Sequence, residues 1–335
     1  MLTRNKLIAG ILASASVFAS STVRAQMDDD EQPPSAREIA GHVFAPSKLV
    51  TNPFTPTFVD VTNGYGYARG TAARYDLRGN QNGTRSYDIA AISQSTTVQV
   101  RIIPALAVRA HGDVIVYAGA NGVAALALGA LVGVEGGAGA TLSFPVGSRM
   151  RLGATLDVDV GPSYNVNLVG AVTRAIEARE FDISGLVSTE TKTTLTPGFT
   201  GSMALLPSLG IGAMFQYQHP ITATQDADTT SKDDLVFGAM ADFDFAKISP
   251  VPIGLVGAYR LDLPIRGERN YTSNSIDLSV LYTGRTHFVV GPELGVRFFT
   301  LVFQTNLPKI LNIPQTREAD TTEWHAQLVF RYYWQ

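Results

Sequence analysis

The chain has 335 residues, of which 16% are charged, with a formal net charge of −3 and no cysteine. The lack of cysteine excludes a disulfide framework and a lipid-modified cysteine. Basic residues are neither in excess nor clustered, so no nucleic-acid partner is expected. The length alone is compatible with two soluble domains, but the residue pattern argues against that organisation.

The first segment has the features of an export signal. Residues 1–6 include two basic side chains, residues 7–19 form an apolar stretch of 13 residues, and a small-x-small site ends at Ala25. This order predicts a secretory signal peptide over 1–25 that is cleaved before Gln26. A membrane anchor is the alternative, but 13 residues are too few for a helix to cross about 30 Å of hydrocarbon.

Residues 26–56 differ in composition from the rest of the chain. Four acidic residues at 28–31 and two prolines at 33–34 predict a mobile periplasmic leader. Residues 45–56 are less polar and contain three prolines. Two interpretations of 45–56 stay open: it packs against a barrel formed by the later residues, or it enters that barrel as a plug.

Strict alternation of apolar and polar residues then begins, and it is clearest over 149–160. Successive side chains of a strand point to opposite faces, so this pattern predicts a strand with one apolar and one polar face. The apolar face holds Met150, Leu152, Ala154, Leu156, Val158 and Val160. The polar face holds Arg149, Arg151, Gly153, Thr155, Asp157 and Asp159.

The same pattern recurs along the rest of the chain and predicts twelve strands, with ten or fourteen as alternatives. Their predicted ranges are 57–67, 86–103, 106–118, 132–144, 149–160, 189–205, 208–218, 234–246, 252–263, 272–283, 286–303 and 321–334. Short and long connections alternate, which is typical of outer-membrane barrels. Backbone groups in lipid must be paired internally, so the sheet must close. We therefore predict an all-β fold, a closed antiparallel up-and-down transmembrane β-barrel over 57–335.

Two segments permit helical interpretations. Residues 114–134 carry no charge and could be taken for a transmembrane helix, but four glycines argue for a strand end, a loop and a second strand. A short helix over 123–131 is compatible with that loop. Residues 166–180 have helical spacing within a long connection. That helix either covers the rim or folds into the mouth and constricts it.

The export signal, the alternating strands and an aromatic C-terminus resemble the bacterial outer-membrane β-barrel class. The resemblance covers about residues 57–335 and extends to the class, without a specific family. It implies residence in the outer membrane of a Gram-negative envelope, with its lipid as a partner. It also implies that the alternating aromatics Phe330, Tyr332 and Trp334 are the mark read by the barrel-assembly machinery.

The inward faces are predicted to line a polar lumen. The predicted lumen residues are Arg101, Arg109, His111, Asp113, Glu135, Arg149, Arg151, Asp157, Asp159, Asp242, Asp244, Arg260, Asp262, Asp277, Glu293, Arg297, His325 and Arg331. Such a wall favours a porin-like channel for passive or weakly selective passage of small polar solutes. The alternatives are a non-transporting surface barrel with a lumen filled by paired side chains and partner-binding loops, and an exported soluble β-protein.

We expect neither enzymatic activity nor a cofactor or metal. A barrel lipase needs Ser and His within hydrogen-bond reach, and the five histidines show no such pairing. An Asp-His protease could still form in the loops, for instance from His219, Asp226 and Asp228. No metal-ligand spacing or phosphate-binding loop is present.

Overall fold

The structure is a computed structural model, and it describes residues 36–75, 81–122, 124, 130–166, 187–221, 233–265, 271–304 and 316–334. The predicted signal peptide 1–25, its cleavage site and the acidic residues of the leader lie outside these ranges. So does the predicted helix over 166–180, apart from Val166, which belongs to a strand. Among the described residues, no helix is long and apolar enough to cross a membrane.

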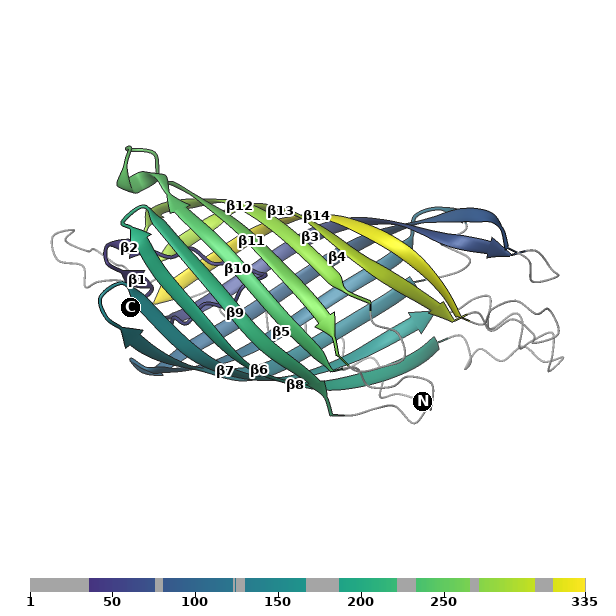
Figure 1. Cartoon of the computed structure of the whole chain (residues 1–335), viewed down its shortest axis with the longest axis horizontal. Helices are drawn as coiled ribbons and strands as arrows, with labels where there is room; N and C mark the ends of the chain where they lie inside the picture. Colours follow the sequence, from purple (N-terminus) through teal and green to yellow (C-terminus); the bar gives the residue numbers. More distant parts are fainter. Residues whose placement is uncertain are drawn as a thin grey trace, which may run out of the picture. The chain divides into compact units, whose positions relative to one another are not determined.

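Twelve antiparallel strands form one closed barrel, as predicted (Figure 1). They are β3 (Thr57–Tyr75), β4 (Gln81–Ile103), β5 (Leu106–Gly119), β6 (Ala130–Val146), β7 (Met150–Val166), β8 (Val187–Leu206), β9 (Leu209–Pro220), β10 (Asp234–Asp244), β11 (Ile253–Pro264), β12 (Ser273–Arg285), β13 (Phe288–Gln304) and β14 (Thr316–Trp334). A short 3-10 helix, η3 (Phe245–Lys247), follows β10.

The barrel closes where the last strand pairs with the first. Trp334 at the end of β14 lies opposite Thr57 at the start of β3. The short connections lie at this end of the barrel, together with a two-stranded sheet of β1 (Glu38–Ile39) and β2 (His42–Val43) (Figure 1). This is the end that the alternating connection lengths assign to the periplasm.

Several strands are longer than predicted at the other end. Residues 68–75 and 81–85 were expected in a long link, but they extend the hairpin of β3 and β4. β7 continues to Val166 and β13 to Gln304. A strand that leaves the lipid has water on both faces and needs no apolar side, so the alternation that revealed its membrane part stops before the strand does.

The uncharged stretch 114–134 belongs to two strands and their connection, as predicted. β5 ends at Gly119 and β6 begins at Ala130. The predicted short helix over 123–131 falls mostly outside the described residues, and its last two positions are already part of β6.

The two faces of the wall differ as a barrel in lipid requires. Leu156, Leu278 and Phe330 point outward and are 49%, 54% and 39% exposed. Their chain neighbours Asp157 and Asp277 point inward and are buried. A continuous apolar outer surface of this kind is suited to lipid tails rather than to water.

Aromatic side chains gather near both ends of the outer wall. At the short-turn end, the rings of Phe288 and Phe330 lie 5.2 Å apart, and those of Tyr332 and Trp334 lie 5.1 Å apart. Towards the other end, Tyr67 stacks on Trp324 at 6.2 Å. Aromatic girdles at the two lipid–water interfaces are a feature of transmembrane barrels.

Candidate functional site: the barrel lumen

The lumen is the candidate site, because the charged residues of the strands face it. Most of the predicted lumen residues are buried or half-buried on the inner wall, while Arg101, Glu135 and Arg149 are exposed. Arg101 and Arg149 lie at the short-turn end. Inside the wall, side chains of opposite charge meet in separate groups.

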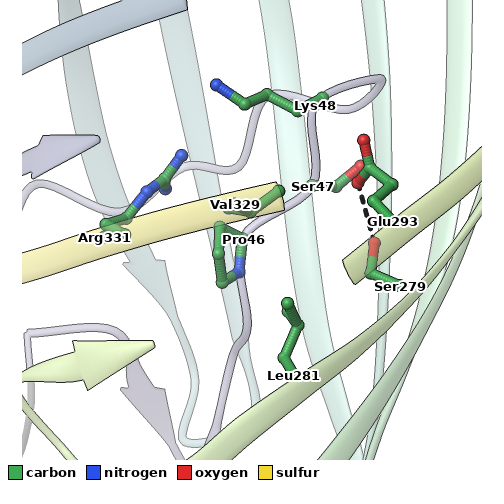
Figure 2. A pocket seen from close by; sticks show the side chains of 8 residues that line it. All are labelled: Pro46, Ser47, Lys48, Ser279, Leu281, Glu293, Val329 and Arg331. Carbon is green, nitrogen blue, oxygen red and sulfur yellow. Dashed lines mark hydrogen bonds between the residues drawn. The ribbon is translucent and has the colours of Figure 1, made fainter. Parts of the chain in front are cut away.

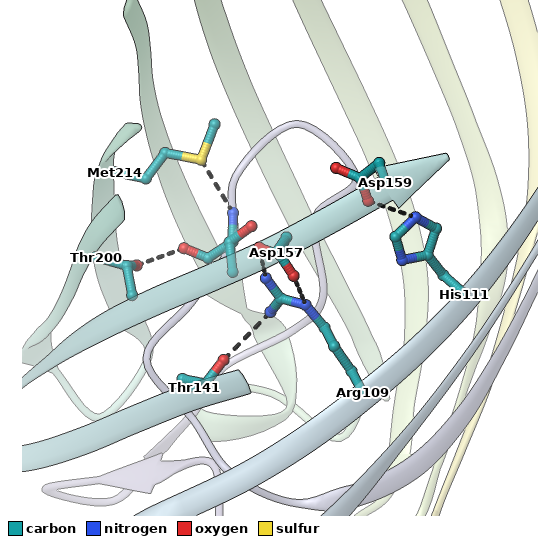
Figure 3. Close-up of polar contacts among 8 residues, drawn as sticks. Arg109, His111, Thr141, Asp157, Asp159, Thr200 and Met214 are labelled. Carbon is teal, nitrogen blue, oxygen red and sulfur yellow. Dashed lines mark hydrogen bonds and ion pairs between the residues drawn. The ribbon is translucent and has the colours of Figure 1, made fainter. Parts of the chain in front are cut away.

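The first group centres on Arg109 of β5. Its Nε donates to Oδ1 of Asp157 at 2.7 Å, and Nη2 donates to Oδ2 of the same carboxylate. Nη1 donates to Oγ1 of Thr141 at 3.2 Å (Figure 3). This bidentate pair joins β5 to β7 across the intervening β6, and it satisfies both buried charges.

His111 lies two residues further along β5. Its Nε2 is 3.1 Å from Oδ1 of Asp159 (Figure 3). The same nitrogen is 3.9 Å from Oδ2 of Asp113. One oxygen of Glu135 lies within 4.8 Å of the ligand atoms of His111 and Asp159. Gly137 stands between the histidine and Asp159 in the register.

A similar group lies on β12, β13 and β14. Nε2 of His325 is 3.1 Å from Oδ1 of Asp277. Glu293 accepts a hydrogen bond from Oγ of Ser279 at 2.7 Å. Gly295 stands between Asp277 and His325 in the register.

A further group, around Asp60 of β3, was missed by the sequence analysis. Asp60 is fully buried and accepts from Nε of Arg331 at 2.7 Å. Its other oxygen accepts from Nζ of Lys48. The alternation in 57–67 gave a weak strand signal, and for 45–56, which contains Lys48, packing against the barrel and entry as a plug were both left open.

The remaining predicted lumen residues make local contacts. Nε of Arg260 is 2.8 Å from Asp262 on the same strand. Nε of Arg297 donates to Oγ of Ser273 at 2.9 Å. Asp244 accepts from Oγ1 of Thr283 at 3.0 Å. Arg151 places its guanidinium 5.8 Å from the ring centre of Phe54.

Residues 36–56, which we call the inner segment, lie inside the barrel at its short-turn end. The backbone N–H of Ala45 donates to Oδ2 of Asp242 at 2.5 Å, and Nε2 of His42 is 3.4 Å from the same oxygen. On the other side of the barrel, Nε2 of Gln99 donates to the carbonyl of Pro56 at 2.8 Å. Asp242 and Gln99, two polar side chains of the wall, thus bind the backbone of the inner segment.

Further contacts fix the inner segment to other strands. Nη1 of Arg37 donates to the carbonyl of Phe44 at 2.7 Å, and its guanidinium lies 4.2 Å from the ring centre of Tyr333 on β14. Oγ1 of Thr200 on β8 donates to the carbonyl of Thr51. The segment is therefore anchored to strands on several sides of the lumen.

Apolar contacts complete the anchoring, and they differ from the wholly polar lumen that the alternation predicted. Ala45 and Val50 of the inner segment belong to one buried cluster with inward-facing side chains of the wall. Its other members are Phe58, Met214, Val236, Met240, Val256, Ala258, Leu281, Val289 and Tyr333. These wall residues are apolar because they meet the inner segment rather than water.

His219, the histidine suggested for an Asp-His protease, contacts an acid other than those suggested. Nδ1 of His219 lies 2.7 Å from Asp233, an ordinary pair at the end of a strand. The acids suggested as its partners, Asp226 and Asp228, lie outside the described residues.

The comparisons with known proteins concern the fold. No family model matches the sequence, and no curated protein matches it significantly. An outer membrane channel from Pseudomonas putida F1 is similar in structure over 87% of this chain and 100% of its own, with 10% identity and a TM-score of 0.51. The chain thus has the fold of outer-membrane β-barrels, the class that its sequence resembles.

Two other similar structures have lower TM-scores. The translocator domain of the autotransporter NalP from Neisseria meningitidis has a TM-score of 0.47 at 9% identity, with 84% of this chain and 90% of that chain covered. A FadL homologue from Pseudomonas aeruginosa has a TM-score of 0.46 at 10% identity, with 84% and 92% covered.

Proposed function

We propose that the protein resides in the outer membrane as a channel for small polar solutes, and that its inner segment closes the lumen in the conformation described here. The observation that carries the proposal is the position of residues 36–56 inside the barrel, held by side-chain contacts to wall strands on several sides. Such contacts are individually worth about 0.5–3 kcal/mol and can be broken and remade.

The inner wall beyond the segment suits polar solutes. Arg109 with Asp157 and His111 with Asp159 place paired charges of both signs along the lumen. Opposed charges order water and favour passage of polar molecules over apolar ones. Asp113 and Glu135 lie beside the second pair, so carboxylates outnumber cations in this part of the wall.

A second candidate function is favoured by one observation. Val50 packs in a buried apolar cluster with Met214, Val236 and Met240 of the wall. A dry cluster of this kind resembles a permanent core, which favours a non-transporting barrel with a filled lumen.

A reversible tether separates the two candidates. A Cβ added at Gly238 would lie 3.1 Å from Cγ2 of Val50, the position that the sulfur of a cysteine at residue 50 could occupy. In a disulfide, the Cβ of one cysteine is about 3 Å from the sulfur of the other, so the two positions suit a bridge. The chain has no cysteine of its own, so the double variant Val50→Cys/Gly238→Cys can form only this bridge within one chain. The added Cβ would also lie 2.8 Å from Cγ and 2.9 Å from Cε of Met214, so the flexible Met214 side chain must shift to admit the bridge.

The measurement is single-channel conductance in a planar bilayer. We expect the double variant to be silent when oxidised and to show stable steps after reduction, while each single variant conducts under both conditions. Silence of the wild type and of the reduced variant would favour the filled barrel. If the double variant shows equal conductance steps before and after reduction, ions pass while the inner segment is tethered. That result would contradict the proposal that the inner segment closes the lumen.

A further inference from the structure

We propose that Asp277, Glu293 and His325 bind one divalent transition-metal ion, of which Zn²⁺ fits best, on the inner wall of β12, β13 and β14. The inference is independent of channel activity. It rests on the geometry of the three side chains, on a buried oxygen of Glu293 that has no hydrogen-bond partner, and on the glycine between Asp277 and His325.

The three ligand atoms already converge. One oxygen of Asp277, one oxygen of Glu293 and one ring nitrogen of His325 all lie within 4.8 Å of one another. The His325 Nε2 to Asp277 Oδ1 distance is 3.1 Å. Ligands of a tetrahedral zinc site, each about 2.0–2.2 Å from the ion, are about 3.4 Å apart. Only a small movement of Glu293 is needed to complete three protein ligands.

The carboxylates of Asp277 and Glu293 are buried, and one oxygen of Glu293 has no hydrogen-bond partner. Glu293 is 2% exposed, and Oε1 has no hydrogen-bond partner, whereas Oε2 accepts from Ser279. Asp277 Oδ1 and His325 Nε2, both buried, contact each other as an ion pair at 3.1 Å. Burying the unpartnered oxygen of Glu293 costs free energy, and a bound cation would remove that cost.

The serine beside Glu293 has the role of an orienting group. Figure 2 shows Oγ of Ser279 bonded to Glu293, with Ser47 and Lys48 of the inner segment close by. A hydrogen bond to one carboxylate oxygen fixes the direction of the other, as outer partners of metal ligands commonly do. Lys48 directs its ammonium to Asp60, so its charge is paired elsewhere.

Gly295 provides the room in which the ligands meet. It lies directly between Asp277 on β12 and His325 on β14. A Cβ at this position would be 2.0 Å from Oδ1 of Asp277 and 2.3 Å from Nε2 of His325. Any other residue would occupy the point toward which the two side chains converge from the neighbouring strands.

The ligand types select the metal. An imidazole nitrogen with carboxylate oxygens suits Zn²⁺ and similar transition ions, whereas Ca²⁺ and Mg²⁺ prefer oxygen alone. The related group of His111, Glu135 and Asp159 around Gly137 has the same residue types. Its Glu135 is exposed, so water can solvate that carboxylate, and the group serves as an internal control.

Calorimetric titration of Zn²⁺ into the metal-stripped full-length protein in detergent tests the site. We expect one ion per chain. Glu293→Gln and His325→Gln should each weaken Zn²⁺ binding by about 100-fold or more, because even partners outside the first shell are worth about 10–100-fold. The matched variant Glu135→Gln should leave the Kd within about twofold of wild type. Circular dichroism and heat-dependent gel mobility report whether each variant folds.

X-ray absorption at the zinc edge on the wild type supplies a test that needs no variant. We expect a shell of oxygen and nitrogen with the signature of a single imidazole. The inference is overturned if the wild type binds no Zn²⁺, if folded Glu293→Gln and His325→Gln bind it as tightly as wild type, if Glu135→Gln alone abolishes binding, or if the bound ion shows no imidazole.

Discussion

Arg331 on the last strand donates from Nε to Oδ2 of Asp60 on the first strand, at 2.7 Å, directly across the seam where the barrel closes. The second oxygen of Asp60 binds Lys48 of the inner segment. One buried carboxylate therefore joins the closure of the barrel to the position of the segment inside it.

Replacing this carboxylate should destabilise the barrel. Asp60→Asn leaves the cations of Arg331 and Lys48 without their partner, and breaking a buried pair in this way costs about 3–5 kcal/mol. The free energy of unfolding, measured by denaturant titration of the protein in lipid vesicles, should fall accordingly. The exposed Asp320 is the matched control, and Asp320→Asn should change stability by no more than about 0.5 kcal/mol. Equal midpoints for the two variants would show that the seam pair is not stabilising.

Weakening one anchor of the inner segment should favour the conducting state. Asp242→Ala removes the acceptor for the N–H of Ala45 and the partner of His42. Hydrogen bonds to charged groups are worth about 1.5–3 kcal/mol, and about 1.4 kcal/mol corresponds to a tenfold change in population. The open fraction in single-channel records should therefore rise at least about tenfold. Asp262→Ala is the matched control, because Asp262 pairs with Arg260 on its own strand and not with the inner segment in the described part of the structure. This variant should leave the open fraction unchanged. The same open fraction in both variants would argue against a gating role for Asp242.

The barrel itself could be predicted because lipid imposes a simple rule. Every membrane-crossing strand must place apolar side chains outward, so residues such as Leu156 and Asp157 alternate visibly in the sequence. Once the hairpin of β3 and β4 rises into water, the rule no longer applies. For this reason the prediction underestimated the length of these strands.

The contacts within the lumen were less accessible to sequence analysis. Alternation indicates that Arg109 and Asp157 face inward, but their pairing depends on the register of two strand interfaces. Met214 and Met240 were not recognised as inward-facing, because an apolar inner residue is explained only by the segment that packs on it. The position of that segment is a tertiary property, and the sequence left it open.

A methyl group at Gly295 should disturb the wall far more than one at Gly257. Gly295→Ala places a Cβ 2.0 Å from Oδ1 of Asp277, whereas a Cβ at Gly257 meets nothing within 4 Å. Overpacking of this kind typically costs about 1–3 kcal/mol. Denaturant titration in metal-free buffer should show that loss for Gly295→Ala and a change near zero for Gly257→Ala. Comparable stability of both variants would mean that the wall around Asp277 yields easily.

The orientation of Leu278 tests most directly whether the apolar face of the wall contacts lipid. Leu278→Cys, labelled with an environment-sensitive fluorophore in reconstituted vesicles, should be quenched by lipids carrying a quencher on the acyl chain and protected from aqueous iodide. The exposed Asp320→Cys should show the reverse. Quenching of the probe at 278 by iodide, with no effect of the lipid quencher, would contradict a membrane-spanning barrel.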